Sequence, residues 1–434
     1  MKLQRSWVRI RPQIAGAVLF WAPLCLLGAV LFNRIWKDFW PGEADVPTDV
    51  LLYREVANAI IAGGVPYRDF FLEYPPASLL AFIPPAFFTT TLQAYATFFA
   101  SEMALVLVGT LVLTTYAART LLGWWWPLSG AVFTAATLLI PYDLLLSRYD
   151  AVVALTLGVT MALTSRWALT AAWASLGFGT AFKLVPVLAT PPLALLSGYR
   201  RGTRALGDVV RGIVQGFAVF VCVVAVFFMP ALLLGGEGYI KSFAYHADRG
   251  LQIESLASSI LMELGWLEYG EGTYGSYNVQ GHYVEFLASM SLPITGALLM
   301  ITADVMYREH RAGRFETAQF PRFAAAFVVA FLLGSKVLSP QYIIWLLPLV
   351  PLTATGVWGI GLSGVFLMIC YMTRLVRDYR EVWIGFMSPG TEVLLGRNLL
   401  LVLLWVLLLC IPSVSNPGAP SGNTARGCEQ RASI

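Results

Sequence analysis

Long apolar runs alternate with short polar segments along almost the whole 434-residue chain. A run of roughly 20 apolar residues is long enough to cross a bilayer as a helix. The pattern predicts an all-α polytopic membrane protein with about twelve transmembrane helices. These spans lie at residues 14–33, 92–117, 124–141, 151–165, 167–182, 184–197, 212–233, 285–304, 321–335, 341–355, 357–373 and 393–411.

Several of these spans are shorter than a full crossing requires. The short ones near residues 183 and 336 adjoin joints that contain lysine and proline. Irregular backbone at membrane depth is tolerated where it lines a polar cavity. We therefore predict broken or partial helices around a cavity at these two joints.

Composition supports burial in lipid. Hydrophobic residues make up 58% of the chain and charged residues 12%, whereas a soluble domain is about half apolar and about a quarter charged. The first apolar run lacks a small-residue cleavage site, so we expect a retained helix and not a removed signal peptide.

Charge orients the predicted spans. With twelve spans and a cytoplasmic N-terminus, Lys and Arg outnumber Asp and Glu in the inner segments, and the reverse holds outside. The basic clusters at 200–211 and 308–322 then lie inside, as the positive-inside rule requires. This predicts a multi-pass plasma-membrane protein with both termini cytoplasmic. Anionic lipid explains the basic clusters, so no nucleic-acid partner is expected.

Residues 78–90 are apolar but short, with Pro84 and Pro85 in the middle. We interpret them as a juxtamembrane element. The alternative, a thirteenth span, would place both basic clusters outside. On the preferred topology residues 1–412 form one integral-membrane domain, with long outer loops at 34–91 and 234–284. Residues 413–434 are polar and rich in Gly, Pro and Ser, so a disordered cytoplasmic tail is expected.

The first outer loop contains DVLLYREVANAIIAGG, which begins at Asp49. Its apolar residues recur at helical spacing and a Gly-Gly pair ends it, which predicts a short amphipathic helix at the interface. Thr48 or Asp49 is expected to cap that helix. Asp49 is thus either a capping acid or a functional one, and spacing alone leaves both open.

The second outer loop concentrates different polar groups within SFAYHADRGLQIESL. Its candidates are His246, Asp248, Arg249, Gln252 and Glu254. Arg249 offers a planar fork suited to phosphate, and His246 can donate to a phosphate or carry a proton. The alternative is a solvated loop whose charges pair with one another.

The shorter outer joints carry further charged and polar residues. These are Arg148 and Asp150, then Lys183, then Lys336 with Gln341 and Tyr342. A cation at a helix end can extend to the interface, but beside apolar sequence it is costly unless it is paired or faces a polar cavity. Two lysines and Arg249 would suit a doubly charged phosphate group.

Common cofactor signatures are absent from the sequence. The five cysteines contain no CxxC pair, and no GxGxxG, P-loop, HExxH or GxSxG pattern occurs. We expect no disulfide framework or zinc site. No metal-ligand set is evident, and a divalent ion held by outer acids stays open.

The order of these features resembles the GT-C superfamily of integral-membrane glycosyltransferases. More narrowly, the chain is similar to glycosyltransferase family 87, the polyprenyl-phosphate-mannose-dependent mannosyltransferase-like proteins. The matching pieces are Asp49 followed by Tyr53, then GGVPY at 63–67, EYPP at 73–76, FKLVP around Lys183, and SPQYIIWLLPL at 339–349.

The resemblance implies a polyprenyl-phosphate sugar donor and a lipid or glycolipid acceptor, with the site on the outer face. It implies that Asp49 is the catalytic base, with Asp38 and Asp45 as nearby competitors. The expected phosphate ligands are Arg249, Lys336, Lys183 and His246. The expected substrate-binding residues are Tyr53, Glu73, Tyr74, Arg148, Asp150, Gln252, Glu254, Gln341 and Tyr342.

Two other classes of function fit the spans. A transporter or flippase of a lipid-linked glycan would explain the buried cations without chemistry, but it explains the long acidic and aromatic outer loops poorly. A non-catalytic assembly partner in an envelope glycan pathway would keep the fold with an inactive site.

Overall fold

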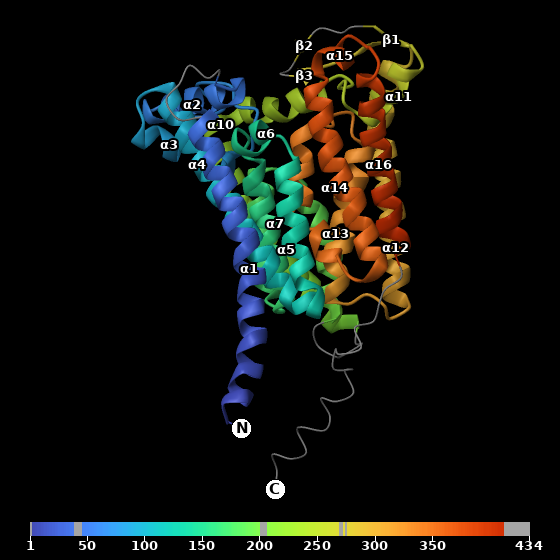
Figure 1. Cartoon of the computed structure of the whole chain (residues 1–434). Coiled ribbons are helices and arrows are strands. Elements are labelled where there is room, and N and C mark those ends of the chain that lie inside the picture. The colour runs from blue at the N-terminus through green and yellow to red at the C-terminus, as the bar shows by residue number, and fades with distance from the viewer. Residues whose placement is uncertain (1, 39–45, 200–205, 269–271, 274–275, 412–434) are drawn as a thin grey trace.

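The protein is an all-α polytopic membrane protein with two short antiparallel strand pairs at one end (Figure 1). The computed structural model describes residues 2–38, 46–199, 206–268, 272–273 and 276–411. Within them, seven helical segments are long and apolar enough to cross a membrane. These are α1 (Lys2–Asp38), α4 (Leu92–Leu121), α10 (Leu206–Ala247), α12 (Val284–Arg311), α13 (Phe320–Gly334) with the turn before it, α14 (Gly356–Asp378) and α16 (Gly390–Cys410).

Shorter helices fill the interior of the bundle between these long ones. They are α5 (Trp126–Leu139), α6 (Tyr142–Leu146), α7 (Asp150–Ser165), α8 (Leu169–Phe182) and α9 (Thr190–Tyr199). Each of the twelve predicted spans coincides with a helical segment, although the one at 341–355 is 3₁₀ helix. The number of membrane crossings stays a prediction.

Two helices, α1 and α10, extend furthest beyond their predicted spans. α1 includes the basic stretch before residue 14, and α10 continues through residues 234–247, which we predicted as loop. Residues 237–247 keep apolar side chains at helical spacing, so the chain resumes the helix after a break at Gly236. Gly236 has φ 52° and ψ −127°, a conformation that a residue without a Cβ adopts readily.

α2 (Thr48–Ile61) and α3 (Leu79–Phe88) lie at the end of the molecule opposite the start of α1 (Figure 1). The predicted interfacial helix is therefore present, and residues 79–88 form a short helix beside it. The prediction that Thr48 or Asp49 caps this helix was wrong. The N-cap residue is Pro47, whose side chain makes no capping hydrogen bond, and Asp49 lies in the first helical turn. There the positive end of the helix dipole favours a carboxylate.

Prolines break the helices at the two predicted joints. α8 ends at Phe182, Lys183 is extended (φ −160°, ψ 137°), and the 3₁₀ helix η3 (Val185–Ala189) follows. α13 ends at Gly334, and η5 (Pro340–Leu346) and η6 (Val350–Thr353) take the place of a regular α-helix. Because proline lacks an N–H, it suits the first position of a helical segment better than its interior.

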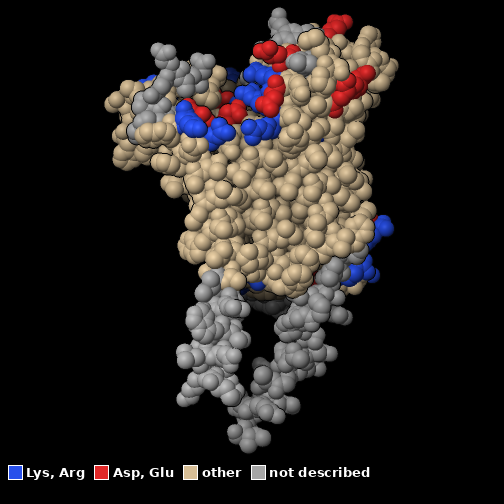
Figure 2. All heavy atoms as spheres, in the orientation of Figure 1, with Lys and Arg blue, Asp and Glu red and all other residues tan. Residues whose placement is uncertain are grey.

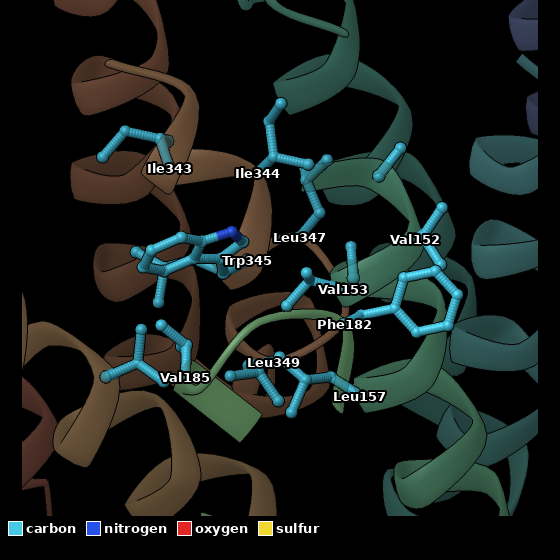
Figure 3. Packing of buried hydrophobic residues seen from close by; sticks show 14 of the residues in the cluster. Val152, Val153, Leu157, Phe182, Val185, Ile343, Ile344, Trp345, Leu347 and Leu349 are labelled. Atoms are coloured by element: carbon cyan, nitrogen blue, oxygen red, sulfur yellow. The ribbon is translucent and has the colours of Figure 1, made fainter. Parts of the chain in front are cut away.

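The broken segments pack into the core of the bundle. Figure 3 shows Trp345 of η5, Val185 of η3 and the α7 side chains Val153 and Leu157 within one cluster of buried hydrophobic residues. Trp345 is 1% exposed, and Leu157 has no exposed surface. The two joints are thus packed against the core, beside the polar residues that flank them.

A small subdomain covers the other side of the same end (Figure 1). It contains α11 (Leu256–Glu263), α15 (Arg380–Ile384) and two antiparallel strand pairs. One pairs β1 (Leu267–Glu268) with β4 (Gln280–Gly281), and the other, between them in the chain, pairs β2 (Gly272–Thr273) with β3 (Ser276–Tyr277). A separate apolar cluster that includes Leu251, Leu261 and Leu394 forms its core.

A buried ion pair fastens this subdomain to α16. Arg397 has no exposed surface, and its guanidinium lies 2.6 Å from Glu254 Oε2 and donates to the Glu254 carbonyl at 2.9 Å. Asn398 donates to the same carbonyl at 3.2 Å and to Ser259 Oγ at 3.0 Å. Removing one partner of such a pair leaves an uncompensated buried charge.

We predict that Glu254→Gln destabilises the protein by about 3 kcal/mol, because Arg397 loses its counter-ion in the interior. Thermal unfolding in detergent measures the effect. Glu263→Gln, which removes an exposed acid from α11, is the matched control and should leave the midpoint nearly unchanged. Equal midpoints for the two variants would contradict a structural role for Glu254.

Candidate active site

A cavity of about 370 Å³ lies among the helix ends on the side of the bundle that carries α2 and α3. Figure 2 shows charged side chains gathered in a hollow at this end of the molecule, above a broad band of uncharged surface. The cavity is lined from α2, the segment after it, the α6–α7 joint, the ends of α8, α10 and α13, and η5. Its polar and charged lining residues are Asp49, Tyr53, Glu73, Tyr74, Arg148, Tyr149, Asp150, Lys183, Tyr239, Ser242, His246, Arg249, Ser335, Lys336, Ser339, Gln341 and Tyr342.

The structure brings together twelve of the fourteen residues that the sequence singled out for catalysis or binding. Four cations and three carboxylates line the cavity, which leaves one excess positive charge with His246 neutral. The roles of these residues stay predictions, but their placement in one cavity does not depend on those roles.

Asp49 forms an ion pair with Arg148, which lies in the short joint between α6 and α7. Both side chains are about one-quarter exposed. Burial raises the pKa of Asp49 above its ordinary value; Arg148 opposes this rise, and the carboxylates of Glu73 and Asp150 add to it. A carboxyl with a raised pKa is a stronger proton acceptor once it is ionised.

Aromatic side chains form the floor beneath Asp49. Tyr53, one turn further along α2, stacks on Phe82 with ring centres 4.1 Å apart. Tyr74 and Tyr149 meet the Tyr53 ring edge-on at 5.6 Å and 6.0 Å. Tyr53 is 1% exposed, so it supports the cavity wall more than it projects into the cavity.

A second ion pair joins the ends of three segments. Lys183 Nζ lies 2.8 Å from Asp150 Oδ1, and the Trp345 indole N–H donates to the same oxygen at 2.7 Å. The Lys183 ammonium lies 5.0–5.2 Å from the ring centres of Tyr149, Tyr342 and Trp345. Asp150 is at the start of α7 and Lys183 at the end of α8, where the helix dipoles favour these charges.

Glu73 and the end of α10 form a third group. Arg249 lies 3.2 Å from Glu73 Oε2, and His246 Nε2 donates to the Glu73 backbone carbonyl at 2.9 Å. These contacts join residues more than 170 positions apart in the sequence. They hold the EYPP segment against the segment that carries the second group of candidates.

Lys336 differs from the other cavity cations. Its ammonium donates to the Ala247 carbonyl at 2.6 Å, and no carboxylate of the described residues lies within ion-pair distance of it. Burial lowers the pKa of Lys336, while the carboxylate of Asp248 opposes this and Arg249 adds to it. Lys336 therefore has positive charge available for an incoming anion.

Gln252 and Glu254 do not line the cavity, so we withdraw the prediction that they bind substrate. The Gln252 side chain accepts from the Leu338 N–H at 2.9 Å, and its backbone N–H donates to the Lys336 carbonyl at 2.9 Å. Glu254 is occupied by Arg397. Gln252 therefore positions the segment that carries Lys336, and Glu254 holds the small subdomain against α16.

The competing acids are placed less favourably or are not described. Asp38 ends α1, with its carboxylate 3.9 Å from Arg34, and does not line the cavity. Asp45 lies outside the described residues. Among the described residues, no three His, Cys, Asp or Glu side chains are grouped closely enough to hold a metal ion.

Sequence reasoning missed one wall of the cavity. Tyr239, Ser242, Phe243 and His246 face it from the end of α10. Their spacing of three, four and seven residues is that of one helix face. The sequence pattern predicts a loop over residues 234–247, and of these four residues it indicates only His246 as a site residue. Recognising that Gly236 interrupts a helix without ending it would have revealed this face.

No protein-family model matches the chain, and no curated protein matches it at a significant level. Solved structures that are similar to the chain include the following two. One is ArnT from Cupriavidus metallidurans bound to undecaprenyl phosphate, 15% identical over 91% of this chain and 78% of that chain, with a TM-score of 0.48. The other is the Archaeoglobus fulgidus oligosaccharyltransferase tethered with an acceptor peptide containing the NVT sequon, 13% identical, with a TM-score of 0.43; the alignment covers 94% of this chain and 57% of that one. Both TM-scores lie below 0.5.

The two cavity lysines are expected to differ in their effect on stability. Lys183→Gln leaves the Asp150 carboxylate, which is 2% exposed, without a counter-ion, and should cost about 3 kcal/mol. Lys336→Gln breaks no ion pair and should change the free energy of unfolding by about 0.5 kcal/mol or less. Thermal unfolding of both variants in detergent checks this, and a larger loss for Lys336→Gln would reverse the assignment.

Proposed function

We propose that the protein is an inverting glycosyltransferase that moves a sugar from a polyprenyl-phosphate donor to a lipid or lipid-linked glycan acceptor at the outer face of the membrane. By the family resemblance that sugar is mannose. The observation that carries the proposal is the convergence of motifs. Asp49, the EYPP segment, FKLVP and SPQY, spread over nearly 300 residues, line one cavity.

The chemistry needs one carboxylate. An acceptor hydroxyl oxygen attacks the anomeric carbon and forms the new glycosidic bond while its proton passes to Asp49. The bond from the anomeric carbon to the phosphate oxygen breaks, and its electron pair leaves with polyprenyl phosphate. Because the attack comes from the face opposite the leaving group, the anomeric configuration inverts. Phosphate is a good leaving group, so a second carboxylate acting as acid is not required.

The cations are suited to the negative charge that grows on the leaving phosphate. Lys336 and Arg249 are the best candidates for phosphate binding. Lys336 makes no ion pair among the described residues, and Arg249 reaches the cavity with a planar guanidinium. Lys183 is a weaker candidate than the sequence indicated, because Asp150 and three aromatic rings already surround it.

The proposal is tested with purified protein in vesicles and a labelled polyprenyl-phosphate-mannose. Transfer of label to lipid acceptors supports the enzyme. Movement of the intact labelled lipid across the bilayer without transfer would instead indicate a flippase. Neither transfer nor movement, across mannose and arabinose donors, would favour an assembly partner with an inactive site.

Replacing Asp49 is the most direct mutational test of its role. We expect Asp49→Asn to lower kcat by about 10³-fold, because the acceptor proton loses its base, while binding of sugar-free polyprenyl phosphate is not weakened. Asp38→Asn is the matched control: it removes an acid at the end of α1 that does not line the cavity. Retained turnover in Asp49→Asn, or loss of turnover in Asp38→Asn, would contradict the assignment of Asp49 as the catalytic base.

The pH dependence should follow the raised pKa of Asp49. A base must be ionised, so activity is retained above its pKa and lost as the pH falls through it. The acid limb of kcat/KM, which reports the free enzyme, should therefore lie above the ordinary aspartate value of about 4. A limb at or below that value would show that the essential base is not this buried carboxyl.

A further inference from the structure

The Asp49–Arg148 pair presents a chemical conflict within the proposed function. A base that faces a guanidinium holds its charge more readily and accepts a proton less readily. In the structure Arg148 lowers the proton affinity of the carboxyl that must take the acceptor proton. The same contact occupies a cation that the donor phosphate would otherwise attract.

We propose that Arg148 is transferred from Asp49 to the donor phosphate when the donor lipid binds, so that one cation restrains the base in the empty site and binds the leaving group in the loaded one. This inference rests on the proposed function, which supplies the phosphate. It makes Asp49 fully basic only when a sugar donor is present.

Geometry supports the transfer. Arg148 and Asp49 both line the cavity and are about one-quarter exposed, so an incoming anion reaches the pair without opening the core. The Arg148 Nε is buried and has no hydrogen-bond partner among the described residues. A guanidinium carries five N–H donors in a planar fork that matches phosphate as well as carboxylate. The donor phosphodiester carries one negative charge, and a second develops on the leaving phosphate as its bond to the anomeric carbon breaks, so its attraction for the guanidinium increases during the reaction.

The groups around Asp49 also favour a higher proton affinity of its carboxylate once Arg148 has moved to the phosphate. The other charged groups that face it are the carboxylates of Glu73, from the segment after α2, and Asp150, from α7. Among the described residues, Tyr53 and Tyr74 are titratable groups that also interact electrostatically with Asp49. Arg148 is thus the cation that holds Asp49 ionised. Once Arg148 moves, the neighbouring acids increase the tendency of Asp49 to take a proton.

The two roles of Arg148 are separated by a double-mutant cycle read by binding alone. The probe is sugar-free polyprenyl phosphate, titrated into purified wild-type protein, Asp49→Asn, Arg148→Gln and the double variant. Arg148→Gln should weaken binding about tenfold, because a charged hydrogen bond to phosphate is lost. Asp49→Asn should tighten binding about tenfold, because Arg148 is released without competition.

The decisive comparison is the effect of Asp49→Asn in the Arg148→Gln background. If Asp49 acts through Arg148, that effect shrinks to about twofold or less. Equal tightening in both backgrounds would mean simple repulsion between Asp49 and the phosphate, and would overturn the proposal. Unchanged binding in Arg148→Gln would overturn it as well.

Controls keep the result independent of folding and of the proposed function. Arg68→Gln breaks the exposed Arg68–Asp69 pair in the segment after α2, outside the cavity, and should leave binding of polyprenyl phosphate unchanged. If Arg148→Gln does not fold, Arg148→Lys takes its place; it keeps the charge but not the fork, and should weaken binding several-fold. Coupling without sugar transfer would refute the proposed function alone, whereas transfer without coupling would refute this inference alone.

Discussion

Pairing of opposite charges is the constraint on which this site depends. A carboxylate among the ends of apolar helices is costly unless a cation or several donors lie against it. Each of the three cavity carboxylates has such a partner: Asp49 has Arg148, Asp150 has Lys183, and Glu73 has Arg249. The pairs differ in solvent exposure, and this difference favours a structural role for the buried pair and a chemical role for the more exposed one. Asp150 is sealed in the wall, while Asp49 faces the cavity.

The same pairs connect segments that the chain order separates. Lys183 and Asp150 join the end of α8 to the start of α7, and the Trp345 N–H brings η5 to the same oxygen. Prolines make this possible, because they end regular helix at 183–186 and 335–340 and leave polar residues at the cavity and not along a lipid-facing helix. A broken helix is thus what places the functional groups.

Much of the fold followed from local pattern. Apolar runs located the helical segments, the Gly-Gly stop located the end of α2, and the Lys-Pro joints indicated the cavity. What failed depended on contacts between distant residues. The sequence indicated Glu254 as a substrate ligand because its ion-pair partner, Arg397, lies 143 positions away, and no local sequence pattern predicts that pair. The α10 wall was missed because the predicted span ends at residue 233, although the helix continues past the glycines at 235, 236 and 238. The number of crossings, the orientation of the termini and the roles of the site residues stay predictions.

The most direct measurement for the proposed function is a structure of the protein with a non-transferable polyprenyl-phosphonate sugar. The proposal predicts the phosphonate against Lys336 and Arg249, with the anomeric carbon facing Asp49 and space for an acceptor oxygen between the two. A phosphonate bound elsewhere, or an anomeric carbon that faces a different acid such as Asp45, Glu73 or Asp150, would contradict it.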